Sequence, residues 1–223
     1  MKYIPKDIKN EPTSLKETRS TPGSTYGDCN REDIRVALLK EQGYICAYCM
    51  KRIDNRVNDK GLPNTRIEHY QAQNPDEPQR DNELQMNFLN MLGVCDGREG
   101  KPKHDQTCDK RRGNDTLTID PRKAFCEQLI AYGDGTIYSD NENIDQELND
   151  VLGLNNQNLI NERKYVRKKV RETLNSYKKN KSQRWSKSDL TKELKIWKSQ
   201  SNYKYSEYCM VAIYYLEKKL ARL

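Results

Sequence analysis

The 223-residue sequence lacks the features that would place it in or across a membrane. No run of apolar residues approaches the roughly 20 residues that a membrane-spanning helix needs. The opening residues, MKYIPKDIKNEP, have no apolar core after their lysines, so they do not form a secretory signal. The sequence therefore predicts a cytoplasmic protein with no membrane partner.

Apolar side chains are scarce, and a nucleotide-binding loop is missing. Hydrophobic residues make up 34% of the chain and charged residues 33%. Leu, Ile, Val, Tyr and Trp nevertheless recur at helical spacing, which excludes disorder throughout. No Gly-x-x-x-x-Gly-Lys-Ser/Thr sequence occurs, so the chain has no P-loop of its own. This composition predicts a mostly helical protein of one sizeable domain or two small ones.

Basic charge is concentrated in the last third of the chain. Residues 157–223 carry 18 Lys and Arg against 6 Asp and Glu, whereas the rest carries 22 against 27. A nucleic-acid phosphate backbone is one natural partner for such a surface. Solvated helix faces with no ligand explain the same charge equally well. Aromatic side chains in this part lie at helical spacing, which favours a core or partner interface over base stacking.

The patterns along the chain predict an arm, a central block and a helical tail. Residues 1–29 are rich in Pro, Thr, Ser and Lys, and their three prolines forbid a continuous helix, so an extended N-terminal arm is expected. Residues 30–122 form the central block, and residues 123–223 form a hairpin followed by helices that dock a partner or nucleic acid. The expected elements are a helix at 31–42, strands near 65–70 and 84–95, a short helix at 108–113, a hairpin at 131–138, and helices from about 146, near 189–199 and near 205–222.

Four of the seven cysteines fall within the central block. Cys46 and Cys49 form a CxxC pair, and Cys95 and Cys108 follow with twelve residues between them. In a cytoplasmic chain, such a set favours metal binding over disulfides, and thiolates are preferred zinc ligands. The sequence therefore predicts a structural zinc ion bound by these four residues. A redox-active CxxC is the alternative, disfavoured because no thioredoxin-like strand pattern surrounds it. Two further cysteines lie in apolar stretches and are predicted core thiols: Cys126 and Cys209.

The order of the motifs in the central block resembles that of a known nuclease family. The motifs are CAYC at 46–49, EHY at 68–70, NML at 90–92 with a cysteine five positions after its asparagine, and CDKRRGN at 108–114. This order is similar to that of the HNH (ββα-metal) endonucleases. The resemblance implies an α+β fold with a central zinc-bound ββα-metal core and phosphodiester hydrolysis. The chain departs from the family pattern by an insertion at 96–107 and by Asp109, where Asn or His is commoner.

The resemblance extends to one subfamily, the PtuB-type nucleases of Septu and retron-linked antiphage systems. The matching stretches are MKYIPKD, EQGYICAYC, FLNMLGVC, TCDKRRGN and MVAIYYLEKKL. It implies an endonuclease that acts as the effector of an antiphage defence complex, with DNA as the favoured substrate. It also implies a PtuA-type ATPase partner and, in the retron case, a reverse transcriptase with its RNA–DNA hybrid.

Phosphodiester hydrolysis requires a base for the attacking water and groups that stabilise charge on the phosphate. A neutral histidine, with an ordinary pKa of about 6.5, can accept the water proton, and His69 is the candidate. The resemblance implies that Glu68 and Asp109 bind a Mg²⁺ or Mn²⁺ ion, which prefers hard oxygen ligands. It implies that Asn90 orients the His69 loop by hydrogen bonding. The implied phosphate contacts are Lys110, Arg111 and Arg112.

Several of these assignments have alternatives. Glu68 and His69 alternate on a regular strand, so both face one site only if the strand ends there. Asn87 is a rival to Asn90, whose spacing to the third cysteine favours it. His104 lies in the insertion at 96–107 and is expected to be a solvated loop residue, while the insertion is a lid, a substrate loop or a partner contact. The rival functions are the same chemistry on RNA, such as tRNA, and a non-catalytic zinc-ribbon adaptor that binds nucleic acid or protein.

Overall fold

The computed structural model describes residues 1–59, 61–72, 82–180 and 182–223. Helices predominate, and two two-stranded antiparallel sheets complete the structure, so the predicted α+β class is confirmed. The α-helices are α1 (Thr13–Ser20), α2 (Arg31–Glu41), α3 (Asn82–Gln85), α4 (Cys108–Arg112), α5 (Glu142–Gln146), α6 (Gln157–Ser176), α7 (Lys187–Lys198) and α8 (Cys209–Leu220). The strands are β1 (Arg66–His69), β2 (Met91–Val94), β3 (Ala131–Tyr132) and β4 (Ile137–Tyr138). Single turns of 3-10 helix occur at Ile8–Asn10, Tyr26–Asp28, Phe88–Asn90, Lys103–Asp105 and Ala124–Glu127, and a π-helical turn at Glu147–Val151.

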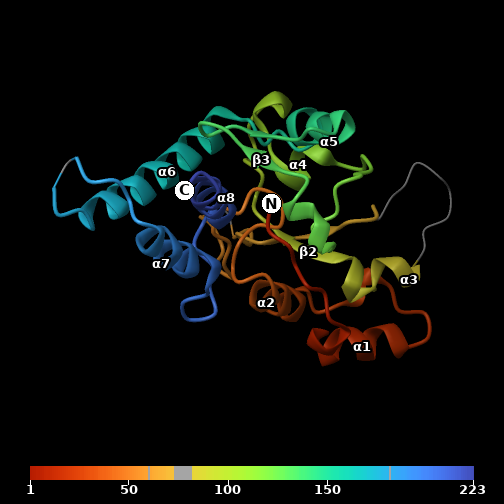
Figure 1. The fold of residues 1–223 in the computed structure, drawn as a ribbon. Helices are drawn as coiled ribbons and strands as arrows, with labels where there is room; N and C mark the ends of the chain where they lie inside the picture. The colour runs from red at the N-terminus through yellow and green to blue at the C-terminus, as the bar shows by residue number, and fades with distance from the viewer. Residues whose placement is uncertain (60, 73–81, 181) are drawn as a thin grey trace.

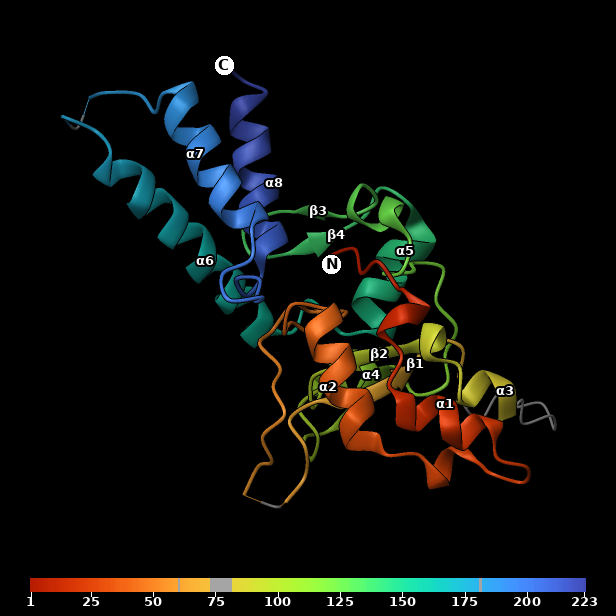
Figure 2. The same ribbon diagram turned by 90° about the horizontal axis from the view of Figure 1, so that it is seen from below.

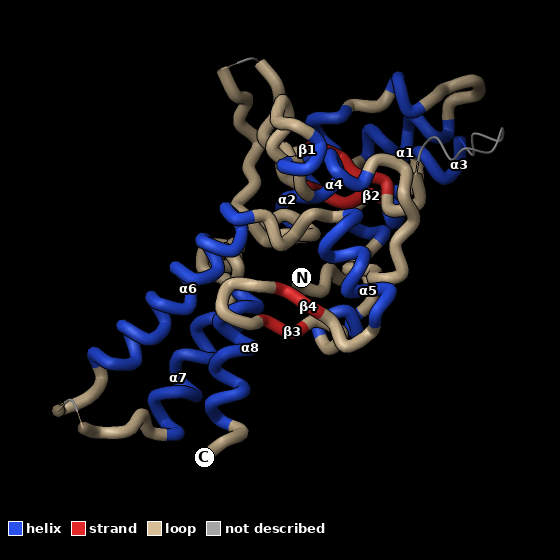
Figure 3. The backbone as a smooth tube through the Cα atoms, turned by 90° about the horizontal axis from the view of Figure 1, so that it is seen from above, coloured by secondary structure: helices blue, strands red, loops and turns tan. Residues whose placement is uncertain are grey.

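The elements gather at two ends of the molecule (Figures 1 and 2). At one end α6, α7 and α8 pack against one another. At the other end α1 and α2 lie beside the β1–β2 pair, and α2 packs against both strands. The tube view shows α4 next to this pair (Figure 3). Within the described ranges, no helix is both long and apolar enough to cross a membrane.

Helix α2 forms as the sequence predicts and leads directly into the first cysteine pair. The Asn30 side chain accepts hydrogen bonds from the backbone N–H groups of residues 32 and 33, which is the predicted N-cap. Ile34 and Leu38 on one face of the helix are fully buried. The helix ends before Gly43, which has φ +60° and packs so closely on Tyr205 that a Cβ would lie 2.4 Å from its ring. Only glycine fits this C-terminal position without strain.

The β1–β2 pair places the EHY and NML motifs side by side. The strands run antiparallel, with Arg66 opposite Val94 and His69 opposite Met91. Gln42, just after α2, fixes the middle of β2: its amide donates to the Gly93 carbonyl and its Oε1 accepts from the Gly93 N–H. The predicted second strand at 84–95 is correct only over its final residues. Its first part is helical instead, because Asn87 caps a 3-10 turn at Phe88–Asn90.

The N-terminal arm wraps the body but is not extended throughout. Residues 13–20 form α1, so the prediction of an extended arm over 1–29 is wrong there. The helix occupies the interval between Pro12 and Pro22, where no proline interrupts it. Leu15 is fully buried against α2, and the Ile4 N–H donates to the Pro121 carbonyl. The arm therefore packs on the same block that carries the cysteines.

One apolar cluster connects the cysteine block with the C-terminal helices. It includes Tyr48 of the CAYC motif, Leu92 of β2, Val170 of α6 and Leu216 of α8. Two other members of this cluster are Cys126 and Cys209, which are buried as predicted for core thiols. The predicted hairpin is present as β3–β4, and the three tail helices are present as α6, α7 and α8. The division of the chain into parts at 29/30 and 122/123 stays a prediction.

Candidate metal centre and active site

The four predicted cysteines meet at one point. All four are buried, and their Sγ atoms lie within 4.8 Å of one another. The Cys46–Cys108 and Cys49–Cys95 sulfur distances are 3.8 Å, and the Cys95–Cys108 distance is 3.7 Å. A disulfide needs about 2.0 Å. A tetrahedron with metal–sulfur bonds of about 2.3 Å has edges of about 3.8 Å, so the cluster could hold one metal ion.

Two backbone turns build this cluster. In the first, the Met50 N–H bonds the Cys46 carbonyl, and the Lys51 N–H points at the Cys49 Sγ at 3.5 Å. In the second, the Thr107 N–H bonds the Gly97 carbonyl at 2.9 Å. This bond closes the insertion at its base, so the long spacing between the last two cysteines does not separate their sulfurs.

The cysteine cluster is joined to two acidic side chains. Tyr48, which lies between the first two cysteines in sequence, donates to Oε1 of Glu68 at 2.8 Å. Asp109 follows Cys108 directly on α4. Burial raises the pKa of Glu68 well above its ordinary value, and a side-chain hydrogen bond with Asp109 and the charge of that carboxylate raise it further. The structure thus brings together the two carboxyl groups that the sequence pairs as metal ligands.

Arg112 is buried, although the sequence resemblance implies that it contacts phosphate. Its guanidinium is buried and forms an ion pair with Oε1 of Glu68. It also donates to the Tyr70 carbonyl at 2.6 Å and to the Tyr48 hydroxyl at 3.1 Å. Arg112 is therefore the internal counter-ion of Glu68, and its contact with phosphate stays a prediction that would require the loss of these partners. Tyr48 and Arg112 both donate to Oε1 of Glu68.

His69 is the last residue of β1 and is buried beside the carboxyl pair. Its ring meets that of Tyr26 edge-on at 4.8 Å between centroids. Its Nε2 lies 2.8 Å from the Gln85 carbonyl oxygen. Burial lowers the pKa of His69 below 6.5, while the Gln85 hydrogen bond and the Asp109 charge oppose this shift. A carbonyl can only accept, so Nε2 carries the proton of the neutral ring and Nδ1 keeps its lone pair.

Asn90 holds the segment that follows His69. Its Oδ1 accepts from the Gln71 N–H at 2.8 Å, and its Nδ2 donates to the Gln71 and Leu84 carbonyls at 3.1 and 3.3 Å. The Asn90 carbonyl also accepts from the Tyr70 N–H at 2.9 Å. Its rival Asn87 caps the preceding 3-10 turn instead. The hydrogen bonds required for the predicted orienting role are therefore present at Asn90.

Lys110 and Arg111 are also engaged within the protein. Lys110 pairs with Glu99 of the insertion at 2.9 Å, and Arg66 pairs with the same carboxylate at 2.7 Å. The hydrogen bonds from these two cations lower the pKa of Glu99 to about 2. Arg111 donates to the backbone carbonyls of Asp150 and His104. The His104 side chain itself is 80% exposed, as expected of a solvated loop residue.

A cleft of about 510 Å³ opens beside Asp109, between α2 and β1. Its wall includes Tyr26, Asp109 and three arginines, at positions 31, 35 and 66. Sequence reasoning missed Tyr26 and the two arginines of α2. The available signal was their four-residue separation on a helix predicted to run into CAYC, which places both on one helix face.

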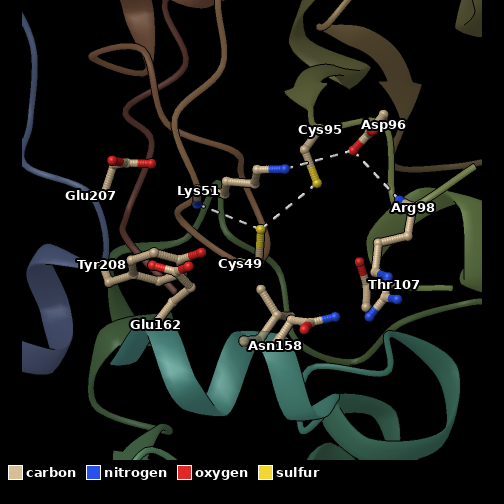
Figure 4. A pocket seen from close by; sticks show the side chains of 11 residues that line it. Cys49, Lys51, Cys95, Asp96, Arg98, Thr107, Asn158, Glu162, Glu207 and Tyr208 are labelled. Carbon is tan, nitrogen blue, oxygen red and sulfur yellow. Dashed lines mark hydrogen bonds and ion pairs between the residues drawn. The ribbon is translucent and has the colours of Figure 1, made fainter. Parts of the chain in front are cut away.

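A second cavity, also of about 510 Å³, lies at the cysteine cluster (Figure 4). Cys49 and Cys95 border it, and Glu162 and Tyr208 close it from the C-terminal helices. Neither predicted catalytic carboxylate nor His69 lines it. The sulfur cluster and Asp109 therefore border two different cavities.

Comparison of the chain with protein-family models and with curated proteins finds no match.

Proposed function

We propose that this protein is a metal-dependent endonuclease of the HNH type that hydrolyses phosphodiester bonds, with DNA as its favoured substrate. The observation that carries this proposal is the contact of two carboxyl groups, the buried Glu68 and the half-buried Asp109, beside a histidine that is neutral at neutral pH. The same three residues follow from the motif order in the sequence. A ββα-metal core would consist of β1, β2 and α4.

His69 is the proposed general base. Its lowered pKa keeps the ring unprotonated at neutral pH. Its bond to the Gln85 carbonyl fixes the tautomer, so that Nδ1 is the atom able to take a proton from water. Asn90 is a positioning residue, because it fixes the chain immediately after His69. In an ion-free protein, the contact of His69 with Tyr26 keeps the ring oriented.

Glu68 and Asp109 are the proposed ligands of a catalytic Mg²⁺ or Mn²⁺ ion. Their carboxylate oxygens are the hard donors that such ions prefer, and Tyr48 and Arg112 both occupy Oε1 of Glu68. Two adjacent carboxyl groups repel each other when both are ionised, and a divalent cation removes that repulsion. Bound there, the ion would stabilise negative charge on the phosphate.

We assign the four-cysteine cluster to structural zinc. Its sulfur spacings fit tetrahedral thiolate coordination, and all four ligand positions are filled by protein. Tyr48 and Asp109 lie next to ligand cysteines in the sequence, so the zinc would position both the carboxylate pair and a donor to it.

The biological context proposed from the sequence resemblance is antiphage defence in the cytoplasm. The proposed partners are a PtuA-type ATPase and, in a retron system, a reverse transcriptase with its RNA–DNA hybrid. RNA such as tRNA is the alternative substrate, since none of the site residues recognises the sugar. These assignments stay predictions.

A non-catalytic zinc-ribbon adaptor is the rival function. The burial of the Glu68–Arg112 ion pair favours it, because a paired buried carboxylate has a structural role without any ion. An adaptor would bind nucleic acid or protein and cleave nothing.

The test is nicking of supercoiled plasmid with Mg²⁺ or Mn²⁺ by the wild type, His69→Ala and His104→Ala. The sequence has two histidines, and the exposed His104 is the matched control. Loss of the base should reduce the nicking rate about 10²- to 10⁴-fold, with zinc content unchanged and His104→Ala at the wild-type rate. Assays with and without the ATPase partner cover a requirement for assembly. If wild type and His69→Ala behave alike in both, the nuclease proposal fails.

A further inference from the structure

The cations that the sequence assigns to phosphate are committed to acceptors of the protein itself. Lys110 pairs with Glu99, and Arg112 pairs with Glu68. Arg111 bonds two backbone carbonyls. A phosphate could bind these residues only by displacing an existing partner, so another part of the site has to supply the first contact.

Two arginines of α2 are not committed in this way. Within the described part of the chain, Nε of Arg35 is buried and has no hydrogen-bond partner. Arg31 has no ion pair among the described residues, and its guanidinium lies 5.4 Å from the centre of the Tyr26 ring. A buried N–H without an acceptor is unfavourable, and a ligand oxygen would remove that cost.

Both arginines line the cleft that contains Asp109. Tyr26 lines the same cleft, and its ring meets the ring of His69 edge-on. The remaining arginine of the cleft, Arg66, is neutralised by Glu99. An anion held by the α2 arginines would therefore lie in the cleft that Asp109 and Tyr26 also line, and Tyr26 contacts His69.

We propose that Arg31 and Arg35 form a clamp for a backbone phosphate of the nucleic-acid substrate, next to the phosphate that is cleaved. This inference rests on the proposed nuclease function, and the arginines are substrate-positioning residues. The planar guanidinium presents parallel N–H donors that match two phosphate oxygens, so two arginines one helical turn apart suit a single phosphate. The clamp belongs to the helix that precedes the motif block, outside the proposed ββα core.

The test is equilibrium binding of a short fluorescent DNA duplex without added divalent ions, at a series of salt concentrations. The variants are Arg31→Gln, Arg35→Gln and their combination. The matched control is Lys40→Gln, which removes one positive charge from the exposed end of the same helix, outside the cleft. The double variant should bind about tenfold more weakly, and its salt dependence should become shallower by about 0.9 per lost phosphate contact. Lys40→Gln should bind like the wild type.

Arg35 is half-buried, so thermal melting by circular dichroism accompanies each variant. Arg31→Gln alters an exposed side chain and tests the clamp without disturbing the fold. Arg35→Lys, which keeps the charge but not the fork, should restore only part of the affinity. If folded Arg31→Gln and the folded double variant bind like Lys40→Gln, the clamp is refuted.

The nicking assay separates this inference from the function on which it rests. Wild-type cleavage with unchanged binding by the arginine variants would refute the clamp and leave the nuclease intact. Arginine-dependent binding without wild-type cleavage would refute the nuclease and leave a nucleic-acid clamp. If both hold, the double variant should raise KM more than it lowers kcat, and a matching RNA duplex in the same assay shows which polymer the clamp prefers.

Discussion

The cysteine cluster lies next to a second cluster, the carboxylate–histidine cluster of Glu68, Asp109 and His69. The side chains of the two clusters have different kinds of partners. The four sulfurs contact chiefly one another, at distances that suit a shared ion. Glu68 has Arg112 and Tyr48 as partners, and His69 has the Gln85 carbonyl. The first cluster could hold a metal ion, whereas protein groups already hold the second in place. This difference in partners is what we expect if the sulfur cluster is the proposed structural centre and the second cluster the proposed active site.

The largest expected effect comes from removing the ion of the sulfur cluster. Zinc coordination contributes an apparent free energy of about 10–16 kcal/mol in small zinc-dependent folds, which matches or exceeds the total stability of an ordinary domain. Cys46→Ser should therefore abolish metal binding and cooperative unfolding of the central block. Metal content and thermal melting measure this, with the buried Cys29→Ser as control. Equal melting of the two variants would contradict a structural ion.

A smaller effect is expected at the internal counter-ion of the second cluster. Arg112→Ala leaves the buried Glu68 without its cation and should destabilise the protein by about 3–5 kcal/mol. Lys110→Ala removes a half-exposed ion pair and should cost no more than about 1 kcal/mol. Urea unfolding of both variants measures the difference. If Arg112→Ala is as stable as Lys110→Ala, Arg112 is not a structural counter-ion.

The smallest of these effects concerns the two asparagines that compete for one role. Asn90→Ala leaves a part-buried N–H and carbonyl of Gln71 without their partner and should cost about 2 kcal/mol or less. Asn87→Ala removes the cap of one 3-10 turn and should cost about 1 kcal/mol or less. Only Asn90→Ala should also slow nicking, because it releases the chain after His69. A larger nicking defect in Asn87→Ala would reverse the assignment.

Local sequence signals predicted the parts of the fold that depend on neighbouring residues. The N-cap Asn30 and the apolar stripe of residues after it predicted helix α2. Gly135 and its neighbours predicted the turn of the β3–β4 hairpin. The spacing of the CxxC pair predicted half of the sulfur cluster, and Cys95 and Cys108 were assigned as the two other cysteines of the central block. The short helix of α1 was missed, because three prolines obscured eight residues that are free of them.

Sequence reasoning failed where a side chain's role depends on what folding brings near it. KRRG predicts a basic surface, yet Arg112 lies buried because Glu68, 44 residues earlier, is its nearest opposite charge. Nothing local marks Arg35 as a cleft residue whose Nε has no partner. Charge sign can be taken from a sequence, but whether a charge is already neutralised depends on tertiary contacts.

The hydrogen bond from Thr107 to Gly97 makes residues 98–106 a side branch of the fold. Because this hydrogen bond holds the two ends of the loop together, the number of residues in the loop can change without moving the cysteines on either side of it. Gly97 keeps this junction tight, because a Cβ there would lie 2.4 Å from the Thr107 carbonyl oxygen. Each doubling of such a loop costs only about 0.6 kcal/mol of closure entropy. Its exposed residues 100–103 are therefore a place where the chain can accept an engineered label or a foreign peptide, while Glu99 keeps its ion pairs with Arg66 and Lys110.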